Sequence, residues 1–263
     1  PIEIPACQGV IASSVSKATD DTDIVSIGKG HYLAIKDHND FDFQGDFTVE
    51  FWAQRYGEQP SQGAIISKYE VAGWIIETNA DEKIHWRDQT NGATDMISKT
   101  KLLDDIWYHV AVTRNQNTFR LFINGILEDI KLVGYKYNSS RMNEPLFIGK
   151  YSKKNNNSFI GYLDEIRISN IARYSDCFNP ESVFIKDKNT TLLIHGDKTS
   201  GSKEFIDSSG GSFTTIDEKI NYSFPAKEIN QYSVNNPNTI LEVMENDYSL
   251  SPASYYASLL TDF

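Results

Sequence analysis

The stretch Gly45-Asp-Phe-Thr-Val-Glu-Phe-Trp-Ala53 decides the fold class of this chain. Its residues alternate between two faces, one carrying Phe47, Val49, Phe51 and Ala53, the other Thr48, Glu50, Trp52 and Gln54. A period of two in β-branched and aromatic residues is the strongest sequence signal for a strand that lies against a core.

Segments of the same kind lie on both sides of this strand. They are residues 31–35, 64–68, 73–77, 83–87, 107–113, 118–123, 126–128, 146–149 and 159–168. Asn124-Gly125 separates two of them, and both residues tolerate the positive φ angles of a tight hairpin turn. Successive strands with short polar turns and no long helical pattern predict an all-β protein, a sandwich or a barrel.

The distribution of strand-like and irregular segments along the chain predicts three parts. Residues 1–23 form an N-terminal arm with a short edge strand, and residues 24–174 form the antiparallel β-sandwich. Residues 175–263 form an irregular C-terminal extension, with a strand at 190–195, a turn of helix at 179–184 and a short helix at 251–260. We expect this extension to dock on the sandwich or on a partner, because long irregular stretches usually order only against something else.

The composition excludes several classes of function. Of 263 residues, 40% are apolar, which is enough for a sizeable core, and the formal net charge is −11. Such a charge argues against nucleic-acid binding and against docking on anionic membranes. No apolar run approaches the ~20 residues of a membrane span, and the first residues lack the pattern of a signal peptide. For the two cysteines, Cys7 and Cys177, separate buried thiols are favoured over a disulfide.

The order of motifs resembles the laminin-G-like, pentraxin-related branch of the concanavalin-A-like lectin/glucanase superfamily. The resemblance rests on segments 46–52, 66–68, 107–114, 121–125, 147–149 and 161–169, which cover about 150 residues in the family's order. It implies a jelly-roll sandwich that binds or packs against something. The Phe-Asp-Gly that many relatives carry near the start is replaced here by Ile27-Gly-Lys-Gly30.

A second, narrower resemblance concerns the tract after the sandwich. Arg173-Tyr174 with Phe178, then segments 191–196 and 205–210, are similar to a stretch found after such domains in bacteriophage tail and virion proteins. It implies a virion component made in the host cytoplasm, with other capsid or tail proteins as partners. A homo-oligomer and attachment to a host-surface glycan are expected with it.

The residues give no sign of a catalytic site. Glycoside hydrolases of this superfamily need two carboxylates across the scissile bond, in a Glu-x-Asp-x-x-Glu pattern that is missing here. Asp164-Glu165 has no third carboxylate in phase, and Glu50 stands alone in its strand. The five histidines show no spacing for zinc. We therefore predict a protein that is not an enzyme.

Asp164 is the first candidate site residue. A strict period of two would place it in phase with Ile160, Ile166 and Ile168, so the carboxylate would need a partner. Backbone N–H groups, a basic side chain and Ca²⁺ remain alternatives, and the family resemblance favours Ca²⁺. The oxygen ligands of such a site would be Asp164 together with Asp37, Asn39 and Asp40.

A second candidate site lies around two tryptophans. Trp74 and Trp86 fall on neighbouring predicted strands, and exposed aromatic rings there would stack on a sugar. Hydrogen bonds would come from Arg87, Asp88 and Asn91. The alternative is that both tryptophans belong to the core of the sandwich.

Three functions follow, in order of preference. The first is a non-enzymatic phage virion protein, a capsid decoration or tail fibre component that stabilises the particle or attaches it to host glycan. The second is a carbohydrate-binding module, calcium-dependent, that is secreted or displayed at the cell surface. The third is a glycoside hydrolase or lyase.

Overall fold

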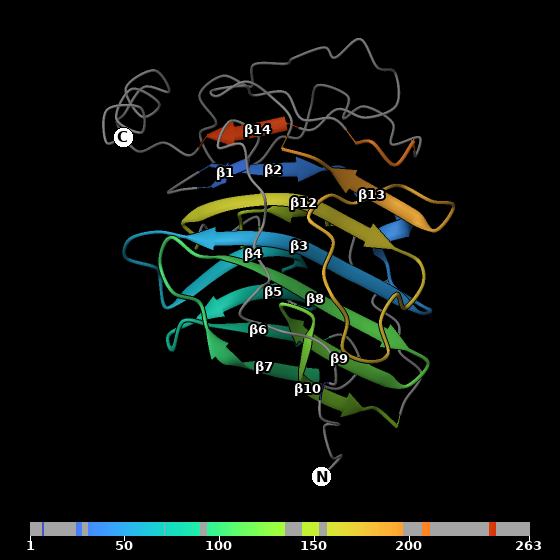
Figure 1. The fold of residues 1–263 in the computed structure, drawn as a ribbon. Coiled ribbons are helices and arrows are strands. Elements are labelled where there is room, and N and C mark those ends of the chain that lie inside the picture. The colour runs from blue at the N-terminus through green and yellow to red at the C-terminus, as the bar shows by residue number, and fades with distance from the viewer. Residues whose placement is uncertain are drawn as a thin grey trace.

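The computed structural model consists of two antiparallel sheets packed face to face (Figure 1). It describes residues 7, 25–27, 31–70, 72–89, 94–134, 144–152, 157–196, 207–210 and 242–245. Apart from one short 3₁₀ turn, η2 (Asn39–Phe41), the regular elements in this part of the chain are strands. The architecture confirms the predicted all-β, jelly-roll sandwich.

Sheet A has the strand order β1-β12-β3-β8-β9-β10, and β13 pairs with β12 beyond the end of β1. Its strands are β1 (Val25–Ile27), β3 (Phe47–Arg55), β8 (Trp107–Asn115), β9 (Thr118–Ile123), β10 (Ile126–Leu132), β12 (Gly161–Ser169) and β13 (Thr190–Ile194).

Sheet B has the strand order β14-β2-β11-β4-β5-β6-β7. Its strands are β2 (His31–Ile35), β4 (Gln62–Tyr69), β5 (Gly73–Asn79), β6 (Lys83–Asp88), β7 (Thr94–Lys101), β11 (Leu146–Ile148) and β14 (Glu242–Glu245). We call the side of each sheet that faces the other sheet its inner face, and the opposite side its outer face.

The core fills the space between the two inner faces. β3 contributes Phe47, Val49, Phe51 and Ala53, as its alternation predicts, and all four side chains are fully buried. Stacked rings of Trp74 and Trp86, with centroids 5.7 Å apart, cross from sheet B toward Phe47.

The hairpin between β9 and β10 confirms the turn predicted at Asn124-Gly125. Asn124 has φ 51° and Gly125 φ 75°, the left-handed conformation that a two-residue hairpin requires. A Cβ atom on Gly125 would come within 1.8 Å of the Phe178 carbonyl oxygen, so the turn also needs glycine for a close backbone contact.

β7 has no counterpart among the predicted strands. Its buried positions are Thr94, Met96 and Ser98, two of them polar, so the alternation of apolar residues is weak. β7 lies at the edge of sheet B, where it pairs only with β6 among the described strands. Edge strands bury less apolar surface, which explains why the sequence pattern does not reveal this one.

A β-bulge in β12 corrects the predicted phase of Asp164. The pairing with β3 shifts between Asp164 and Arg167, and Glu165 has φ 51°. Because of this extra residue, Ile166 and Ile168 lie in the core, while Asp164 is paired with Trp52 on the outer side. The prediction that Asp164 shares a face with these isoleucines is therefore wrong.

The chain after β12 crosses the outer face of sheet A, where its gold segment lies over β3 and β8 (Figure 1). Trp52 donates its indole N–H to the Glu181 carbonyl oxygen at 3.0 Å, and Phe184 packs on the Trp52 ring. Residues 179–184 are irregular, so the helical turn predicted there is wrong. Both faces of β3 are consequently buried.

A disulfide bond joins Cys7 to Cys177, 170 residues apart in sequence. The expectation of two separate thiols is therefore wrong. Sequence spacing could not predict this pairing, because it depends on where the segment after β12 places Cys177. The bond fixes one point of the N-terminal arm to the segment that crosses sheet A.

Several predictions fall outside the described residues, namely the edge strand near the N-terminus and the helix at 251–260. The division of the chain at residues 23 and 174 also remains a prediction. Within the described residues, no helix is long and apolar enough to span a membrane.

Candidate functional site

The two tryptophans of the predicted sugar site belong to the core. Trp74 and Trp86 are 0% exposed, and the Trp74 indole N–H donates to the Phe41 carbonyl oxygen at 3.1 Å. Neither ring can stack on a sugar in this structure, so the core alternative is correct for both.

The other members of that predicted site are separated from the tryptophans. Arg87 follows Trp86 in β6 and therefore points to the outer face of sheet B, away from the core. Asp88 is buried, and Asn91 lies outside the described residues. Of the predicted set, Arg87 is thus the residue that the structure places in a position to meet a ligand.

Arg87 belongs to a group of polar and aromatic side chains on the outer face of sheet B, which we call the outer polar cluster. Alternation within β5 and β6 places these side chains opposite Trp74 and Trp86, and the aromatic members come from β4 and from the segment after β11. The cluster consists of Tyr69, Glu77, His85, Arg87 and Tyr151.

Glu77 and Arg87 form the centre of the cluster. Arg87 Nε lies 2.8 Å from Glu77 Oε1, and Arg87 Nη2 donates to the Tyr151 hydroxyl. The Arg87 guanidinium also lies 5.8 Å from the Tyr69 ring centroid and 5.6 Å from that of Tyr151. Burial alone would lower the pKa of Arg87, but the charge of Glu77 and the bond to Tyr151 raise it. The cation is therefore fixed in charge and in position.

His85 and Tyr69 extend the cluster to its two sides. The His85 ring lies between two carboxylates, with Nδ1 3.4 Å from Glu77 Oε1 and Nε2 3.4 Å from Asp95 Oδ1. The Tyr69 hydroxyl donates to Gln89 Oε1 at 2.7 Å, and burial raises the pKa of Tyr69. Asp95 and Gln89 are exposed, so the cluster reaches solvent at its margin.

Neither oxygen of Glu77 has a hydrogen-bond partner in the described part of the chain, and Oε2, unlike Oε1, has no ion pair either. The Glu77 side chain is 0% exposed, and no donor in the described part of the chain reaches Oε2. A buried carboxylate oxygen without a donor is costly, and native proteins rarely leave one. A ligand that brings an O–H or N–H group would satisfy it, provided that neighbouring side chains move aside, because solvent does not reach this oxygen in the structure.

The predicted calcium ligands do not come together. Asp164 Oδ1 accepts from the N–H groups of Glu165 at 2.7 Å and Gly196 at 2.9 Å, so the backbone is its partner. Asp37 Oδ1 lies 2.6 Å from Lys68 Nζ, and Asp40 Oδ2 lies 3.3 Å from His38 Nδ1. Asn39 is exposed on the same 3₁₀ turn as Asp40. Within the described ranges, no three His, Cys, Asp or Glu side chains form a metal-binding group.

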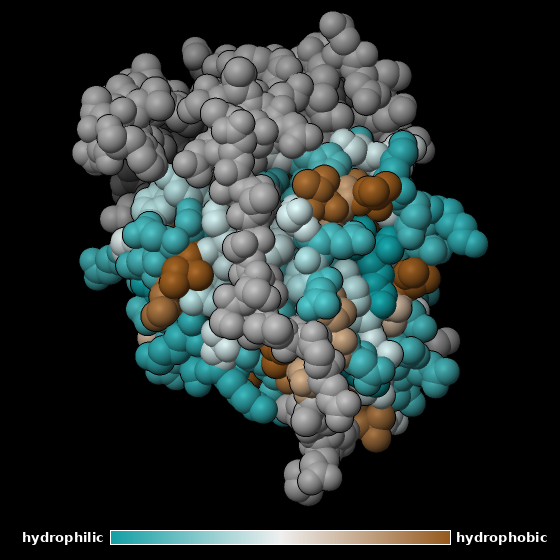
Figure 2. All heavy atoms as spheres, viewed as in Figure 1, coloured by the Kyte–Doolittle hydropathy of each residue, from teal (hydrophilic) through white to brown (hydrophobic). Residues whose placement is uncertain are grey.

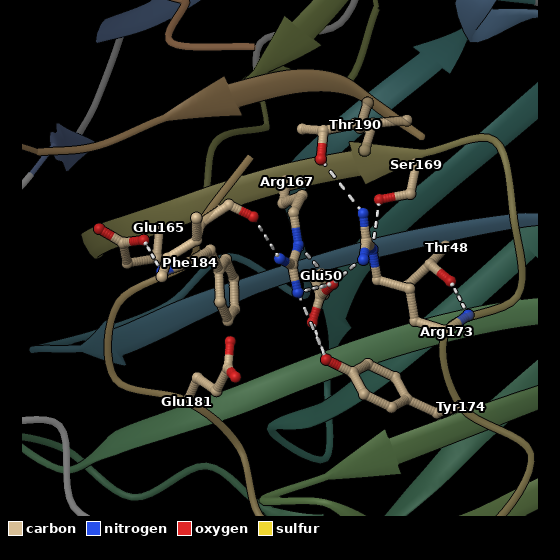
Figure 3. Close-up of polar contacts among 12 residues, drawn as sticks. Thr48, Glu50, Glu165, Arg167, Ser169, Arg173, Tyr174, Glu181, Phe184 and Thr190 are labelled. Carbon is tan, nitrogen blue, oxygen red and sulfur yellow. Dashed lines mark hydrogen bonds and ion pairs between the residues drawn. The ribbon is translucent and has the colours of Figure 1, made fainter. Parts of the chain in front are cut away.

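A second polar network lies under the segment that crosses sheet A (Figure 3). Glu50 Oε1 lies 2.8 Å from both Nε and Nη2 of Arg167. Glu50 Oε2 accepts from the Tyr174 hydroxyl at 2.8 Å and lies 3.3 Å from Nε2 of His109. Burial opposes the charge of Glu50, but His109 and Arg167 outweigh it and lower the Glu50 pKa.

Arg173 lies at the margin of this network. Its guanidinium donates to Asp187, with Nη2 2.8 Å from Oδ1, and to the Ser169 hydroxyl at 2.7 Å. The network is fully buried at Glu50, and both Glu50 oxygens are satisfied. His109 Nδ1 has no hydrogen-bond partner among the described residues, but the carboxylate at the centre of the network has no oxygen left for a ligand. The network fastens residues 170–187 to the sheet.

The view of Figure 2 is toward sheet A, and its described surface is mostly hydrophilic, with apolar side chains in small separate groups. The exposed large apolar residues are Ile97, Leu103, Ile106, Leu132, Val183 and Ile185. Scattered apolar residues of this kind are ordinary on a protein surface and do not define a docking site.

Sequence reasoning found Arg87 but missed the residues around it. The signal for Glu77 was present, because this carboxylate directly follows Ile76 and alternates with Trp74 and Ile76, so it must point away from the core. Tyr69 and Tyr151 carried no such signal. They reach Arg87 only because β4 lies next to β5 in the sheet and β11 lies next to β4.

The fold and the cluster together define a lectin-like β-sandwich with polar and aromatic side chains on one outer face. The family model described as the concanavalin A-like lectin/glucanases superfamily matches residues 27–176. This chain belongs to that superfamily. A search of the curated proteins found no match.

Several solved structures are similar to this chain. A protein from Bacteroides ovatus, provisionally assigned to carbohydrate binding, is 18% identical and has a TM-score of 0.59, covering 72% of this chain and 56% of its own. This chain thus spans little more than half of that relative. A heptameric pentraxin of Limulus polyphemus is 15% identical (TM-score 0.45, 58% of this chain, 78% of that one). Domains LG4-5 of the mouse laminin α1 chain are 16% identical (TM-score 0.43, 61% and 47%).

Proposed function

We propose that this chain is a non-enzymatic, lectin-like module that binds a glycan at the outer polar cluster of sheet B. The observation that carries the proposal is the buried Oε2 atom of Glu77, which has no donor in the described part of the chain. Superfamily membership and the carbohydrate-binding assignment of the Bacteroides ovatus protein support the same class of ligand.

The chemistry of the cluster suits a sugar. Glu77 accepts hydrogen bonds from hydroxyl groups, and Arg87 presents a rigid planar set of N–H donors that Tyr151 holds in place. Tyr69 and Tyr151 meet edge to face, with centroids 5.6 Å apart, and supply aromatic surface beside these polar groups. Small-molecule sites usually combine a few fixed polar groups with aromatic side chains.

Hydrolysis at this cluster is disfavoured by its geometry. A glycosidase needs space for a water or a glycosidic oxygen between its two carboxylates. Here the His85 ring occupies the space between Glu77 and Asp95, with one ring nitrogen toward each. Glu77 Oε1 is also paired with Arg87 Nε at 2.8 Å, so this oxygen does not face an open space.

Binding on a glycan array tests the proposal. The wild-type chain should bind at least one sugar family, and Glu77→Gln should weaken that binding about tenfold or more through loss of a charged acceptor. The exposed carboxylate variant Glu58→Gln is the matched control and should bind as the wild type does. Adding a chelator to a parallel array tests calcium dependence. Absence of binding to every glycan would contradict the proposal.

Display of this module on a phage particle is a second proposal, about location. It rests on the resemblance of the tract from Arg173 to Gly210 to segments of virion proteins. The described residues of this tract contact sheet A through the hydrogen bond from Tyr174 to Glu50 and through β13. Other virion proteins and further copies of the chain would then be its partners.

The disulfide bond between Cys7 and Cys177 favours the other location, secretion or the cell surface, because disulfides persist mainly in oxidising compartments. Fractionation of particles and culture medium separates the two. Recovery in purified virions supports display, and recovery only in medium or at the cell surface contradicts it. Neither result bears on the proposal that the chain binds a glycan.

A further inference from the structure

A lysine beside the outer polar cluster is buried without a counter-ion. Lys150 follows β11 and is 5% exposed. Its ammonium lies 4.3 Å from the Tyr32 ring centroid and 5.3 Å from that of Phe147, and it donates to the Tyr32 hydroxyl at 3.2 Å. Tyr32 and Phe147 pack together on the outer face of sheet B, so Lys150 lies on that face as well.

Three other buried cations in the described part of the chain are paired with carboxylates. Lys68 is 2% exposed, and its ammonium lies 2.6 Å from Asp37 Oδ1 and in contact with Asp42. Arg55 pairs with Glu82 and Asp104, and Arg167 pairs with Glu50. No carboxylate of the described residues comes within ion-pair distance of Lys150 Nζ. Buried charges in proteins usually have a partner of opposite charge. The chain follows this rule at these three positions and departs from it at Lys150.

The surroundings of Lys150 fit an anion better than a neutral partner. Burial lowers the Lys150 pKa to about 8, and the charge of Glu70, in the turn after β4, acts in the opposite direction. The ammonium thus stays protonated at pH 7 despite its burial. The faces of Tyr32 and Phe147 attract it only weakly, so a negatively charged ligand group would be its strongest partner.

Lys150 is also continuous with the outer polar cluster. The next residue, Tyr151, accepts a hydrogen bond from Arg87, so one peptide bond joins the two positions. The Arg87 charge is already compensated by Glu77. We propose that Lys150 recognises an anionic group, a carboxylate or a sulfate, on the glycan bound at the outer face of sheet B. This inference rests on the proposed glycan-binding function and specifies its ligand class.

Titration calorimetry with matched sugars tests the inference. The probes are oligogalacturonate and its methyl ester, and a sulfated oligosaccharide and its desulfated form. The wild type should bind the acidic member of at least one pair about tenfold more tightly, and the pair that shows this identifies carboxylate or sulfate. Lys150→Met should abolish that preference, and Lys150→Arg should restore most of it.

The thermal unfolding of each variant is measured first, so that loss of fold is not read as loss of binding. If Lys150→Met fails to fold, the preference of the wild type for the acidic sugar over its neutral counterpart still tests the anion site. Equal affinity for both members of each pair overturns the anion site and leaves glycan binding intact. A preference that survives in folded Lys150→Met also overturns it. If no probe and no array glycan binds, the proposed function fails, and this inference fails with it.

Discussion

Arg167 and Glu50 face each other across β12 and β3, with the guanidinium Nε and Nη2 atoms both 2.8 Å from one carboxylate oxygen. This pair lies beneath the segment that crosses sheet A and is closed off from solvent. The free energy that this ion pair contributes to folding tests whether the crossing segment folds together with the sandwich.

Glu50→Gln should lower the free energy of unfolding by about 3 kcal/mol, because it leaves Arg167 buried without its anion. Glu82→Gln is the control, since Glu82 pairs with Arg55 at a solvent-accessible position, where the loss of stability should be much smaller. Denaturant titration followed by circular dichroism measures both. Equal losses for the two variants would show that the Glu50 network adds nothing.

The same carboxylate should make the fold sensitive to acid. The Glu50 pKa is lowered in the folded state, so its contribution is present at pH values above the ordinary glutamate range. That contribution disappears as the pH falls through the lowered value, where the folded carboxylate becomes protonated. The difference in stability between wild type and Glu50→Gln should therefore narrow below about pH 4. A difference that is constant down to pH 2 would contradict this.

A chain cut after residue 176 should fold poorly, although the family match ends there. The cut removes Phe178, Phe184 and Leu193, which cover Trp52, His109 and Phe122 on the outer face of sheet A. Burial of each large apolar side chain contributes roughly 1.5–3 kcal/mol. A chain cut after residue 210 keeps these contacts and should be clearly more stable by thermal unfolding. The reverse order would show that the sandwich is independent of this segment.

Reduction of the Cys7–Cys177 bond should lower stability by about 2–4 kcal/mol, since the bond closes a loop of 170 residues in the unfolded chain. Melting curves with and without reductant measure the effect, and Cys177→Ser serves as the genetic control. The denatured, unreduced wild type should show no free thiol. Two free thiols per chain would disprove the bond.

Trp86→Ala should destabilise the fold by about 3–5 kcal/mol, because the ring fills the core between the sheets. The milder Trp86→Phe, if folded, should keep the glycan affinity of the wild type, since the indole does not reach the outer face. Calorimetry on the folded variant measures this. Loss of glycan affinity without loss of stability would show that Trp86 belongs to the binding site.

Alkaline pH should reveal the cost of burying Lys150. The folded state favours the neutral amine, with a pKa of about 8 against an ordinary 10.5. The wild type should therefore gain stability relative to Lys150→Met as the pH rises from 8 toward 10.5, and the difference should be constant below 8. Tyr32 and Glu70 face the amine. The same comparison is therefore repeated in chains that also carry Tyr32→Phe or Glu70→Gln, so that a pH effect of these two groups is distinguished from that of Lys150. A flat difference across this range would contradict the lowered pKa.

The sequence by itself determined the sandwich. Residues Phe47 to Ala53 alternate because one face of β3 meets the core, and the hairpin at Asn124-Gly125 depends on two neighbouring residues that accept positive φ. Signals of this kind are local, because side-chain period and turn geometry are properties of a few consecutive residues. The prediction was weakest at β7, where the buried positions of an edge strand are partly polar.

Only the tertiary structure decided the sites. One extra residue in the bulge at Asp164-Glu165 reversed the phase of β12 and placed Asp164 Oδ1 next to the backbone N–H groups of Glu165 and Gly196. Sheet order brought Tyr69 and Tyr151 to Arg87, and the crossing segment brought Cys177 to Cys7. These contacts join residues far apart in the chain, so no local pattern encodes them. Glu77 and Lys150 stand out for the same reason, because a buried oxygen without a donor and a buried ammonium without a carboxylate are visible only once the neighbouring residues are in place.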